Sequence, residues 1–263
     1  KSVILPLFFE DVQSLTKDEF IGLINTVGSS LLPSQSMEED QSESDIISDD
    51  FDGQLLSFII ACMNDPDDLK STPAMYYFTE LQDKLGFIPE AVDLLYNNLT
   101  MDDGLEAGEF QMVSDCISTL KSIAQNHPEE MLEFIIPHIK QDLSESEFIS
   151  MKRGLRGLVA ISSCLSESDI EGICESIIEF LSTPMRKEAI STLENIALAH
   201  PEFYPQSLNS IFPFICFTED DDEEENSRLR LQAQRSLMNL FGEFEGQIDI
   251  PCNQYIGFVY QMI

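Results

Sequence analysis

The sequence predicts an all-α fold, an α-solenoid built from antiparallel pairs of helices. The first observation is an internal repeat: residues 116–129 and 189–202, which lie 73 positions apart, are identical at nine of fourteen positions. Their apolar residues keep helical spacing. Half of that offset is about 36 residues, a typical length for one helix pair in a solenoid. The second observation is that no segment alternates apolar and polar residues over the length of a strand.

Start and stop signals predict the helices of the first half. Thr16 and Glu19 have the spacing of a capping box for a helix that Pro33 ends. A short apolar helix is expected over 54–63. The next helix is expected to start at Thr72-Pro73, with proline at its first position, and to end at Gly86.

The second half follows the same scheme. Pro128 opens a predicted helix over 129–143, which the internal Pro137 is expected to kink. A helix over 146–165 follows, and Ser166 is the predicted N-cap of a helix over 168–181. A helix over 203–217 contains a second internal proline, Pro213, and a further helix is expected from Arg228 to Glu243.

These helices group into repeating units, each with a first helix of the form xxLLPxIxxxL and a second of the form (K/R)xxAxxxLxxLA. Two acidic segments, 34–52 and 218–226, interrupt the period and are expected to be loops, since long insertions cost little chain entropy. The prediction is one continuous solenoid of about six helix pairs. Its units lie near residues 2–33, 54–86, 88–126, 129–165, 168–199 and 202–243, with a partial unit at 251–263.

The charge of the chain limits its possible partners. With 48 acidic and 14 basic residues the net charge is −34, so nucleic acid and anionic membrane surfaces are disfavoured as direct ligands. A basic protein or peptide is the partner that this charge favours, although acidity can also serve solubility alone. The six cysteines show no paired spacing, which indicates a reducing compartment.

No arrangement of residues supports catalysis, and we expect no enzyme activity, cofactor or metal. His127 and His200 precede prolines at matching repeat positions, His138 lies within a predicted helix, and no nucleophile and base group around them. Calcium loops centred on Gly53 or Gly104 lack the required carboxylates, and there is no glycine-rich phosphate loop.

The two-helix form resembles HEAT repeats. The matching positions lie in three successive units. In the unit 129–165 they are Ile136-Pro137 and residues 151–153; in the unit 168–199 they are residues 185–189, Leu193 and Ala197; in the unit 202–243 they are Arg230, Ala233, Leu237 and Leu240. HEAT units usually carry an Asp in the turn and Val-Arg at the start of the second helix, and this chain keeps both only loosely. The resemblance implies a right-handed superhelix.

Among HEAT proteins, the chain is most similar to the importin-β (karyopherin-β) nuclear transport receptors. The similarity rests on the strong acidity, the acidic loop 219–225 within one unit, and the segment 200–208, which leads into a Leu/Ile-rich helix. It implies a carrier of basic cargo that is regulated by the GTPase Ran, contacts Phe-Gly nucleoporins and works in cytoplasm and nucleus. The alternative is a HEAT scaffold of a phosphatase, chromatin complex or assembly factor. Because the chain starts without Met and ends in an apolar pattern, we expect it to be a segment of a longer protein.

Two sets of residues are the predicted protein-binding sites. The first is the acidic run, which could clamp a basic segment of cargo or of Ran, or could be a solvated loop: Glu219, Asp220, Asp221, Asp222, Glu223, Glu224 and Glu225. The acids within residues 38–52 are a weaker candidate of the same kind. The second set lies on polar faces of second helices, which line the concave surface in HEAT arrays; these faces could also be ordinary hydrated surface. It contains Asp115, Ser118, Ser122, Glu188, Ser191 and Asn195.

Overall fold

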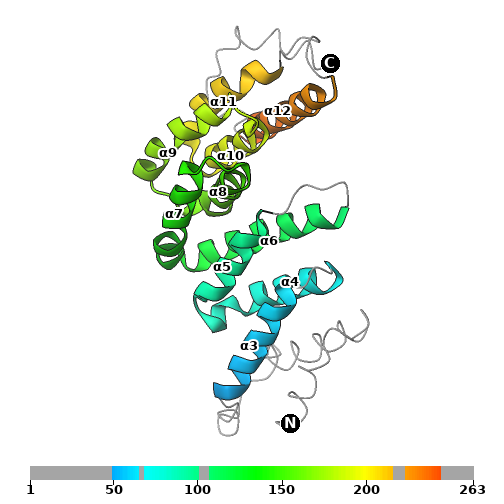
Figure 1. Ribbon diagram of the computed structural model, residues 1–263. Coiled ribbons are helices and arrows are strands. Elements are labelled where there is room, and N and C mark those ends of the chain that lie inside the picture. The colour runs from blue at the N-terminus through cyan, green and yellow to red at the C-terminus, as the bar shows by residue number, and fades with distance from the viewer. Residues whose placement is uncertain (1–48, 65–67, 101–106, 216–222, 244–263) are drawn as a thin grey trace. The chain divides into compact units, whose positions relative to one another are not determined.

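A computed structural model describes residues 49–64, 68–100, 107–215 and 223–243 of the chain (Figure 1). All regular secondary structure in this part of the chain is helical, which confirms the predicted fold class. The predicted units 2–33 and 251–263 lie outside the described residues. The chain divides into two compact units, residues 1–165 and 166–263. The single continuous solenoid and its right-handed superhelix stay predictions.

The first unit is a stack of helix pairs. Within each pair the two helices pack on each other, and the second helices α4, α6 and α8 also pack on one another in turn (Figure 1). The pairs are α3 (Asp49–Met63) with α4 (Asp68–Leu85), α5 (Pro89–Asn98) with α6 (Ala107–Asn126), and α7 (Pro128–Ser144) with α8 (Phe148–Ile161), which continues into the 3-10 turn η2 (Ser162–Cys164).

The second unit repeats this plan. Helix α10 is at its centre and packs against α9, α11 and α12. The elements are α9 (Glu167–Phe180), α10 (Arg186–Ala199), η3 (Pro201–Phe203), α11 (Tyr204–Ile211), η4 (Phe212–Ile215) and α12 (Glu223–Glu243).

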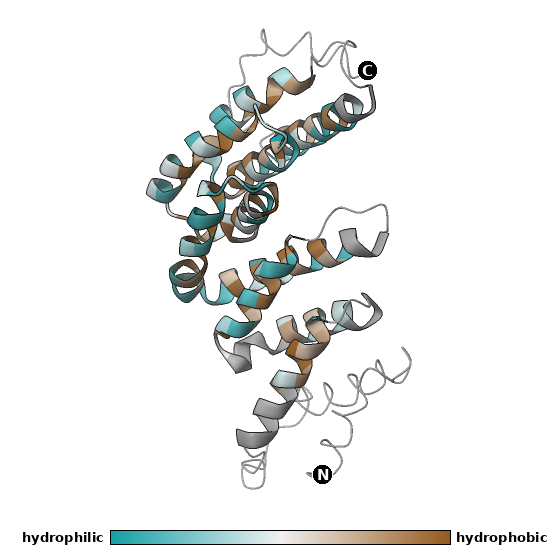
Figure 2. Ribbon diagram, in the orientation of Figure 1, coloured by the Kyte–Doolittle hydropathy of each residue, from teal (hydrophilic) through white to brown (hydrophobic). Residues whose placement is uncertain are grey.

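The repeated motif forms the core of both units. Leu120 in α6 and its counterpart Leu193 in α10 are fully buried, as are Cys116 and its counterpart Ala189. Figure 2 shows the same division along the helices, with apolar positions gathered where helices meet and polar ones outside. Burial of these stripes is the main source of stability that a solenoid unit has.

Several predicted end signals are present. Ser166 is the N-cap of α9, and its hydroxyl oxygen accepts a hydrogen bond from the backbone N–H of Asp169 in a capping box. Gly86 follows α4 with a φ of 70°, a left-handed conformation that glycine adopts without a steric penalty.

Three helices start four or five residues earlier than the sequence predicted, and all three start in acidic residues. Carboxylates are favourable in the first turn because they interact with the positive end of the helix dipole. Acidic segments interpreted as loop therefore contribute to helices. The observed starts are Asp49 for α3, Asp68 for α4 and Glu223 for α12, in place of Gln54, Thr72 and Arg228.

Proline position explains two further differences. Pro73 is the sixth residue of α4 rather than its first, and there it removes one backbone hydrogen bond from the helix. The predicted helix over 203–217 is divided, because the α-helix ends at Ile211 and Pro213 lies in the 3-10 turn η4. Helix α8 likewise ends at Ile161, and η2 follows it.

Candidate protein-binding surfaces

The acidic run is partly helical. Glu219, Asp220, Asp221 and Asp222 lie outside the described residues, whereas 223–225 form the first turn of α12. The segment that was expected to be one loop is therefore divided at Glu223. Its role in binding a basic partner stays a prediction.

On α6, one predicted site residue is used within the fold. The carboxylate of Asp115 accepts a hydrogen bond from the Thr72 hydroxyl of α4 (Oγ1 to Oδ2, 2.6 Å) and one from the Gln111 amide (2.7 Å). Ser118 is exposed and Ser122 is half-buried. Asp115 thus joins α4 to α6, and Ser118 is the predicted residue of this helix that remains most accessible.

On α10, the three predicted residues Glu188, Ser191 and Asn195 are half-buried. The Asn195 amide donates to the backbone carbonyl of Ser191 (2.9 Å). These residues share one side of the helix, and their role in binding also stays a prediction.

A carboxylate that was not predicted as a site residue lies beside them. Glu194 of α10 is buried, and it accepts hydrogen bonds from the Ser236 hydroxyl (2.5 Å) and the Asn239 amide (2.7 Å) of α12. Two directed hydrogen bonds satisfy the carboxylate, as a buried charge requires. Glu194 therefore connects two second helices.

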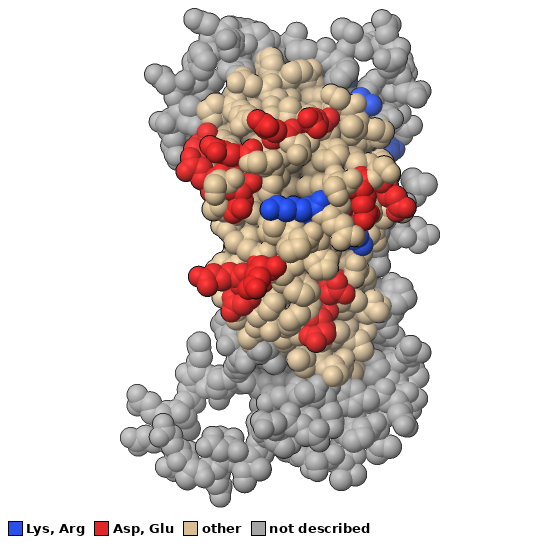
Figure 3. Space-filling view, turned by 60° about the vertical axis from the view of Figure 1, so that its left-hand side comes forward, with Lys and Arg blue, Asp and Glu red and all other residues tan. Residues whose placement is uncertain are grey.

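The most regular charged surface is a row of glutamates on α9. Glu167, Glu171, Glu175 and Glu179 are all exposed and recur every four residues, and α9 contains no Lys or Arg. Like charges at this spacing destabilise a helix by about 0.2–0.5 kcal/mol per pair. This row was not predicted, although its spacing is visible in the sequence. Figure 3 shows how acidic side chains form separate groups on one face of the molecule, with few basic ones between them.

Charge is divided between helices within the second unit. The first helix α9 is purely acidic, whereas α12 carries Arg228, Arg230 and Arg235 and has no acid between Arg228 and Gly242. The arginines thus lie in the part of α12 that follows its acidic first turn, whereas α9 is acidic along its whole length.

A row of aromatic rings follows α5 and α7. The centre of the Phe87 ring lies 6.3 Å from that of His127 and 6.0 Å from that of Phe134. The centre of the His138 ring lies 5.4 Å from that of Phe134 and 6.2 Å from that of Tyr96. Most of these pairs are edge-to-face, the arrangement that aromatic rings favour. Phe87 and Phe134 are half-buried and His138 is exposed, so part of the row faces solvent.

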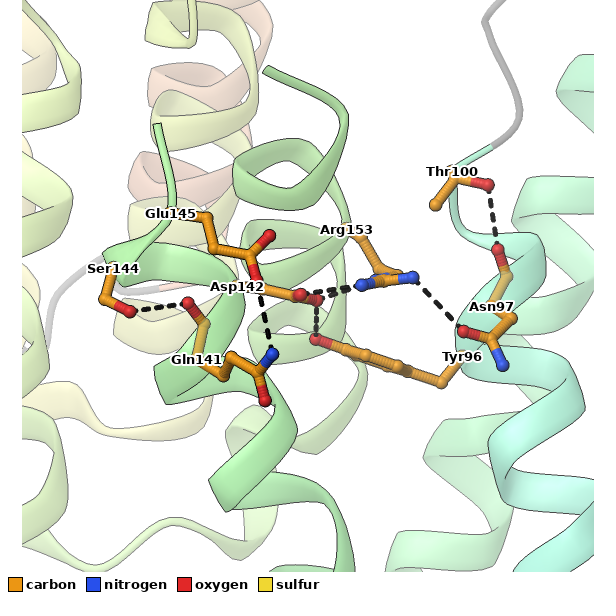
Figure 4. A network of polar contacts seen from close by, with 8 residues as sticks. All are labelled: Tyr96, Asn97, Thr100, Gln141, Asp142, Ser144, Glu145 and Arg153. Carbon is orange, nitrogen blue, oxygen red and sulfur yellow. Dashed lines mark hydrogen bonds and ion pairs between the residues drawn. The ribbon is translucent and has the colours of Figure 1, made fainter. Parts of the chain in front are cut away.

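The row ends at a polar network that joins three helices (Figure 4). Asp142 of α7 accepts two hydrogen bonds from the Arg153 guanidinium of α8, both 2.7 Å, and one from the Tyr96 hydroxyl of α5, 2.6 Å. The guanidinium lies 5.4 Å from the centre of the Tyr96 ring and also donates to the Asn97 side chain at 3.2 Å.

The network holds its charges in fixed positions. Asp142 is almost completely buried, and the bidentate Arg153 neutralises it. Burial, followed by the hydrogen bond to Asp142, raises the pKa of Tyr96 above its usual range, so the hydroxyl stays protonated. The hydrogen bond to Asp142 also raises the pKa of Arg153. The network thus joins α5, α7 and α8 and stabilises their stack.

The cysteines at 62, 116, 164 and 174 form no disulfide bond. Burial raises the pKa of Cys116 to about 12 and that of Cys174 to about 11. An unfolded thiol has a pKa near 8.5, so the folded chain holds these protons more tightly.

We therefore expect stability to be complete below about pH 8.5 and to fall as the pH rises above it, by at most about 1.4 kcal/mol per pH unit for each thiol. Urea unfolding followed by circular dichroism at pH 8, 9 and 10 measures this slope. Ala189 occupies the matching repeat position, so Cys116→Ala is a conservative change there. We expect this variant to lose the part of the pH dependence of the unfolding free energy that the Cys116 thiol contributes. An unchanged slope in this variant would contradict the assignment.

Within the described residues, no group of His, Cys, Asp and Glu is arranged to hold a metal ion. None of the helices in that part of the chain is long and apolar enough to span a membrane.

The comparisons with known proteins bear on the fold. No protein-family model matches the chain, and no curated protein matches it. The solved structure of Kap121p, an importin-β, bound to Nup53p matches 93% of this chain at 15% identity and a TM-score of 0.62. The chain spans 26% of the length of Kap121p.

Two designed proteins also match, at a TM-score of 0.35, which indicates only loose similarity. An engineered protein covers 74% of this chain and 83% of its own length at 16% identity. A computationally designed armadillo repeat protein for modular peptide recognition covers 72% and 84% at 13% identity. The match to Kap121p alone carries the comparison: the fold is that of a HEAT-type helical-repeat protein and resembles that of an importin-β, as the sequence predicted.

Proposed function

We propose that this chain is a protein-binding scaffold, and that it forms part of a nuclear transport receptor that carries basic cargo and is regulated by Ran. The observation that carries the proposal is the exposed glutamate row of α9, on a chain of net charge −34. The row lacks any basic residue of its own helix, so a Lys/Arg-rich segment would relieve its internal repulsion. The likeness of the fold to Kap121p supports the transport role.

Phe-Gly nucleoporins are the second proposed partner class. Kap121p was crystallised with Nup53p, a nucleoporin, bound to it. In the present chain the aromatic row of Phe87, Phe134 and His138 offers half-buried and exposed ring edges between α5 and α7. A phenylalanine side chain would gain both apolar burial and edge-to-face contacts there.

A titration with a Lys/Arg-rich peptide tests the first proposal. We expect binding that weakens as salt rises from about 0.05 to 0.5 M, because screening shortens the reach of exposed charges. Absence of binding at low salt would contradict the basic-cargo proposal. Recovery of the full-length protein with phosphatase or chromatin subunits, and without Ran, would instead support the alternative HEAT scaffold.

The double substitution Glu171→Gln/Glu175→Gln on α9 locates the site. It removes all three repulsive pairs of the row, so we expect a gain in stability of about 0.6–1.5 kcal/mol together with weaker binding of the basic peptide. Urea unfolding and fluorescence anisotropy measure the two effects.

The matched control is Glu130→Gln/Glu133→Gln on α7, which makes the same change of charge at two exposed positions of the first unit. We expect this control to bind the peptide almost as well as the original chain. An equal loss of affinity in both variants would mean that overall charge, rather than the α9 row, attracts the peptide.

A further inference from the structure

The turn between α7 and α8 carries an accessible serine hydroxyl. Ser144 is the last residue of α7 and is exposed. Its hydroxyl donates a hydrogen bond to the backbone carbonyl of Gln141 in the last turn of the same helix (2.7 Å). Because this bond is local and exposed to solvent, another molecule can reach the oxygen without disturbing the core of the first unit.

Carboxylates follow this hydroxyl at the first and third positions. Glu145 is half-buried, and its carboxylate accepts a hydrogen bond from the Gln141 amide (3.2 Å). Glu147 is exposed, and its side chain makes no capping hydrogen bond at the start of α8. No Lys or Arg occurs between Lys140 and Lys152, so the segment itself contains no base that would neutralise these acids. A hydroxyl followed by a fixed pattern of negative charge is a feature that a basic cleft can recognise.

The residues that follow Ser144 already have an extended backbone. Glu145 has φ −74° and ψ 152°, and Glu147 has φ −80° and ψ 126°. Residues 145–147 belong to no helix. An enzyme that modifies a side chain must hold the neighbouring backbone in its cleft, and this segment can enter such a cleft without the unfolding of a helical turn.

We propose that Ser144 is a phosphorylation site for a serine/threonine kinase that reads carboxylates at the first and third positions after its acceptor. Lys and Arg side chains of such a kinase can pair with Glu145 and Glu147. The Oγ atom of Ser144 forms a bond to the γ-phosphorus of ATP as the bond from that phosphorus to the β-phosphate oxygen breaks. The hydroxyl proton passes to the catalytic carboxylate of the kinase, and ADP leaves. The proposal does not depend on the binding of basic cargo by α9.

A phosphate at this position would act on the polar network of Asp142. It would replace the hydroxyl donor of Ser144 with about two negative charges at the C-terminal end of α7, where the helix dipole is already negative. Figure 4 shows Ser144 and Arg153 on opposite sides of Asp142, so the guanidinium would not neutralise the phosphate. Lys140, one turn earlier, would offset only part of the repulsion. We therefore expect phosphorylation to loosen the turn from which Asp142 holds Arg153.

Ser168 of α9 provides a comparison within the same chain. It is exposed and is followed by Asp169 and Glu171 at the same two positions, but all three residues lie within the helix. A kinase that accepted Ser168 would first have to unfold this turn. We therefore expect Ser144 to be phosphorylated several-fold faster than Ser168 in the folded chain. Synthetic peptides of residues 141–152 and 163–174 should lose this difference, because neither contains the folded turn.

The test incubates the whole 263-residue chain with ATP, Mg²⁺ and casein kinase II, an acid-directed kinase. Tryptic cleavage after Lys140 and Lys152 releases residues 141–152 as one peptide, in which fragmentation by mass spectrometry locates the phosphate. We expect phosphate on Ser144. The rate should be about tenfold lower in Glu147→Gln, because this variant lacks one charge-assisted contact with the kinase.

Glu130→Gln, which makes the same change of charge at an exposed position of α7, is the matched control and should leave the rate unchanged. Absence of phosphate on Ser144, or an equal loss of rate in both variants, would overturn the proposal. Phosphorylation of Ser168 as fast as Ser144 in the folded chain would also overturn it. A preference for Ser144 that persisted in the two peptides would arise from sequence alone and would contradict the structural argument.

Amide hydrogen exchange measures the effect of the phosphate on α7. The reference is Ser144→Ala treated with the same kinase, which lacks both the phosphate and the hydrogen bond to Gln141. We expect the amides in the last turn of α7 to exchange about two- to fivefold faster in the phosphorylated chain than in this reference. Equal exchange would overturn the proposed loosening. Binding of the basic peptide by α9 is measured separately, so this proposal and the proposed function fail independently.

Discussion

Gly157→Ala is expected to destabilise the first unit by about 1–3 kcal/mol, the usual cost of forcing an extra carbon into a packed site. A Cβ atom at this position would lie 2.6 Å from Cε2 of Tyr96 and 3.1 Å from Cγ1 of Ile139. The tyrosine ring cannot move away easily, because its hydroxyl is hydrogen-bonded to Asp142. The higher helix propensity of alanine, worth up to about 1 kcal/mol, offsets only part of this cost.

Amide hydrogen exchange measures this effect locally, with faster exchange expected in α5, α7 and α8. Gly172→Ala on α9 is the matched control, because a Cβ there meets nothing within 4 Å. The same substitution should then stabilise α9 by about 0.5–1 kcal/mol. Slower exchange in both variants would show that the close contact at Gly157 is not maintained.

Asp142→Ala is expected to cost about 3–5 kcal/mol, because it leaves the partly buried Arg153 without its counter-charge and the Tyr96 hydroxyl without its acceptor. Exchange should increase along α5, α7 and α8 together, since each contributes one member of the network. Urea unfolding followed by circular dichroism gives the free energy.

A double-mutant cycle with Arg153→Met separates the charge pair from the lost packing. We expect the double variant to be more stable than the sum of the two single losses, because removal of both partners leaves no buried charge unpaired. Strict additivity would mean that Asp142 and Arg153 do not interact in solution.

Local signals made much of the fold predictable. Three signals that depend only on residues close together in the sequence were confirmed. They are the repeated helix motif at 116 and 189, the helix N-cap at Ser166 and the glycine that follows a helix at 86. The acidic helix starts were missed for a physical reason: runs of carboxylates indicate solvated loop by composition, yet the same carboxylates favour the first turn of a helix.

The contacts between helices could not be predicted in the same way. Tyr96 and Asp142 are 46 residues apart, and Glu194 and Ser236 are 42 apart, so no local pattern pairs them. Asp115 was predicted as part of a binding face, which stays a prediction, and its hydrogen bond with Thr72 spans 43 residues of sequence. By contrast, the α9 glutamate row depends only on four-residue spacing and could have been found from the sequence.

The hydrogen bonds of Glu194 between α10 and α12 restrict how these two helices can move along each other. Interdigitated apolar side chains oppose small shifts of one helix along another by their shape, but they have no polar direction, and a shift of one whole turn can bring similar side chains together again. The bonds from Ser236 and Asn239 to Glu194 do have direction, and a shift of one helical turn would break both of them. The buried carboxylate of Glu194 thus fixes the register of α12 along α10.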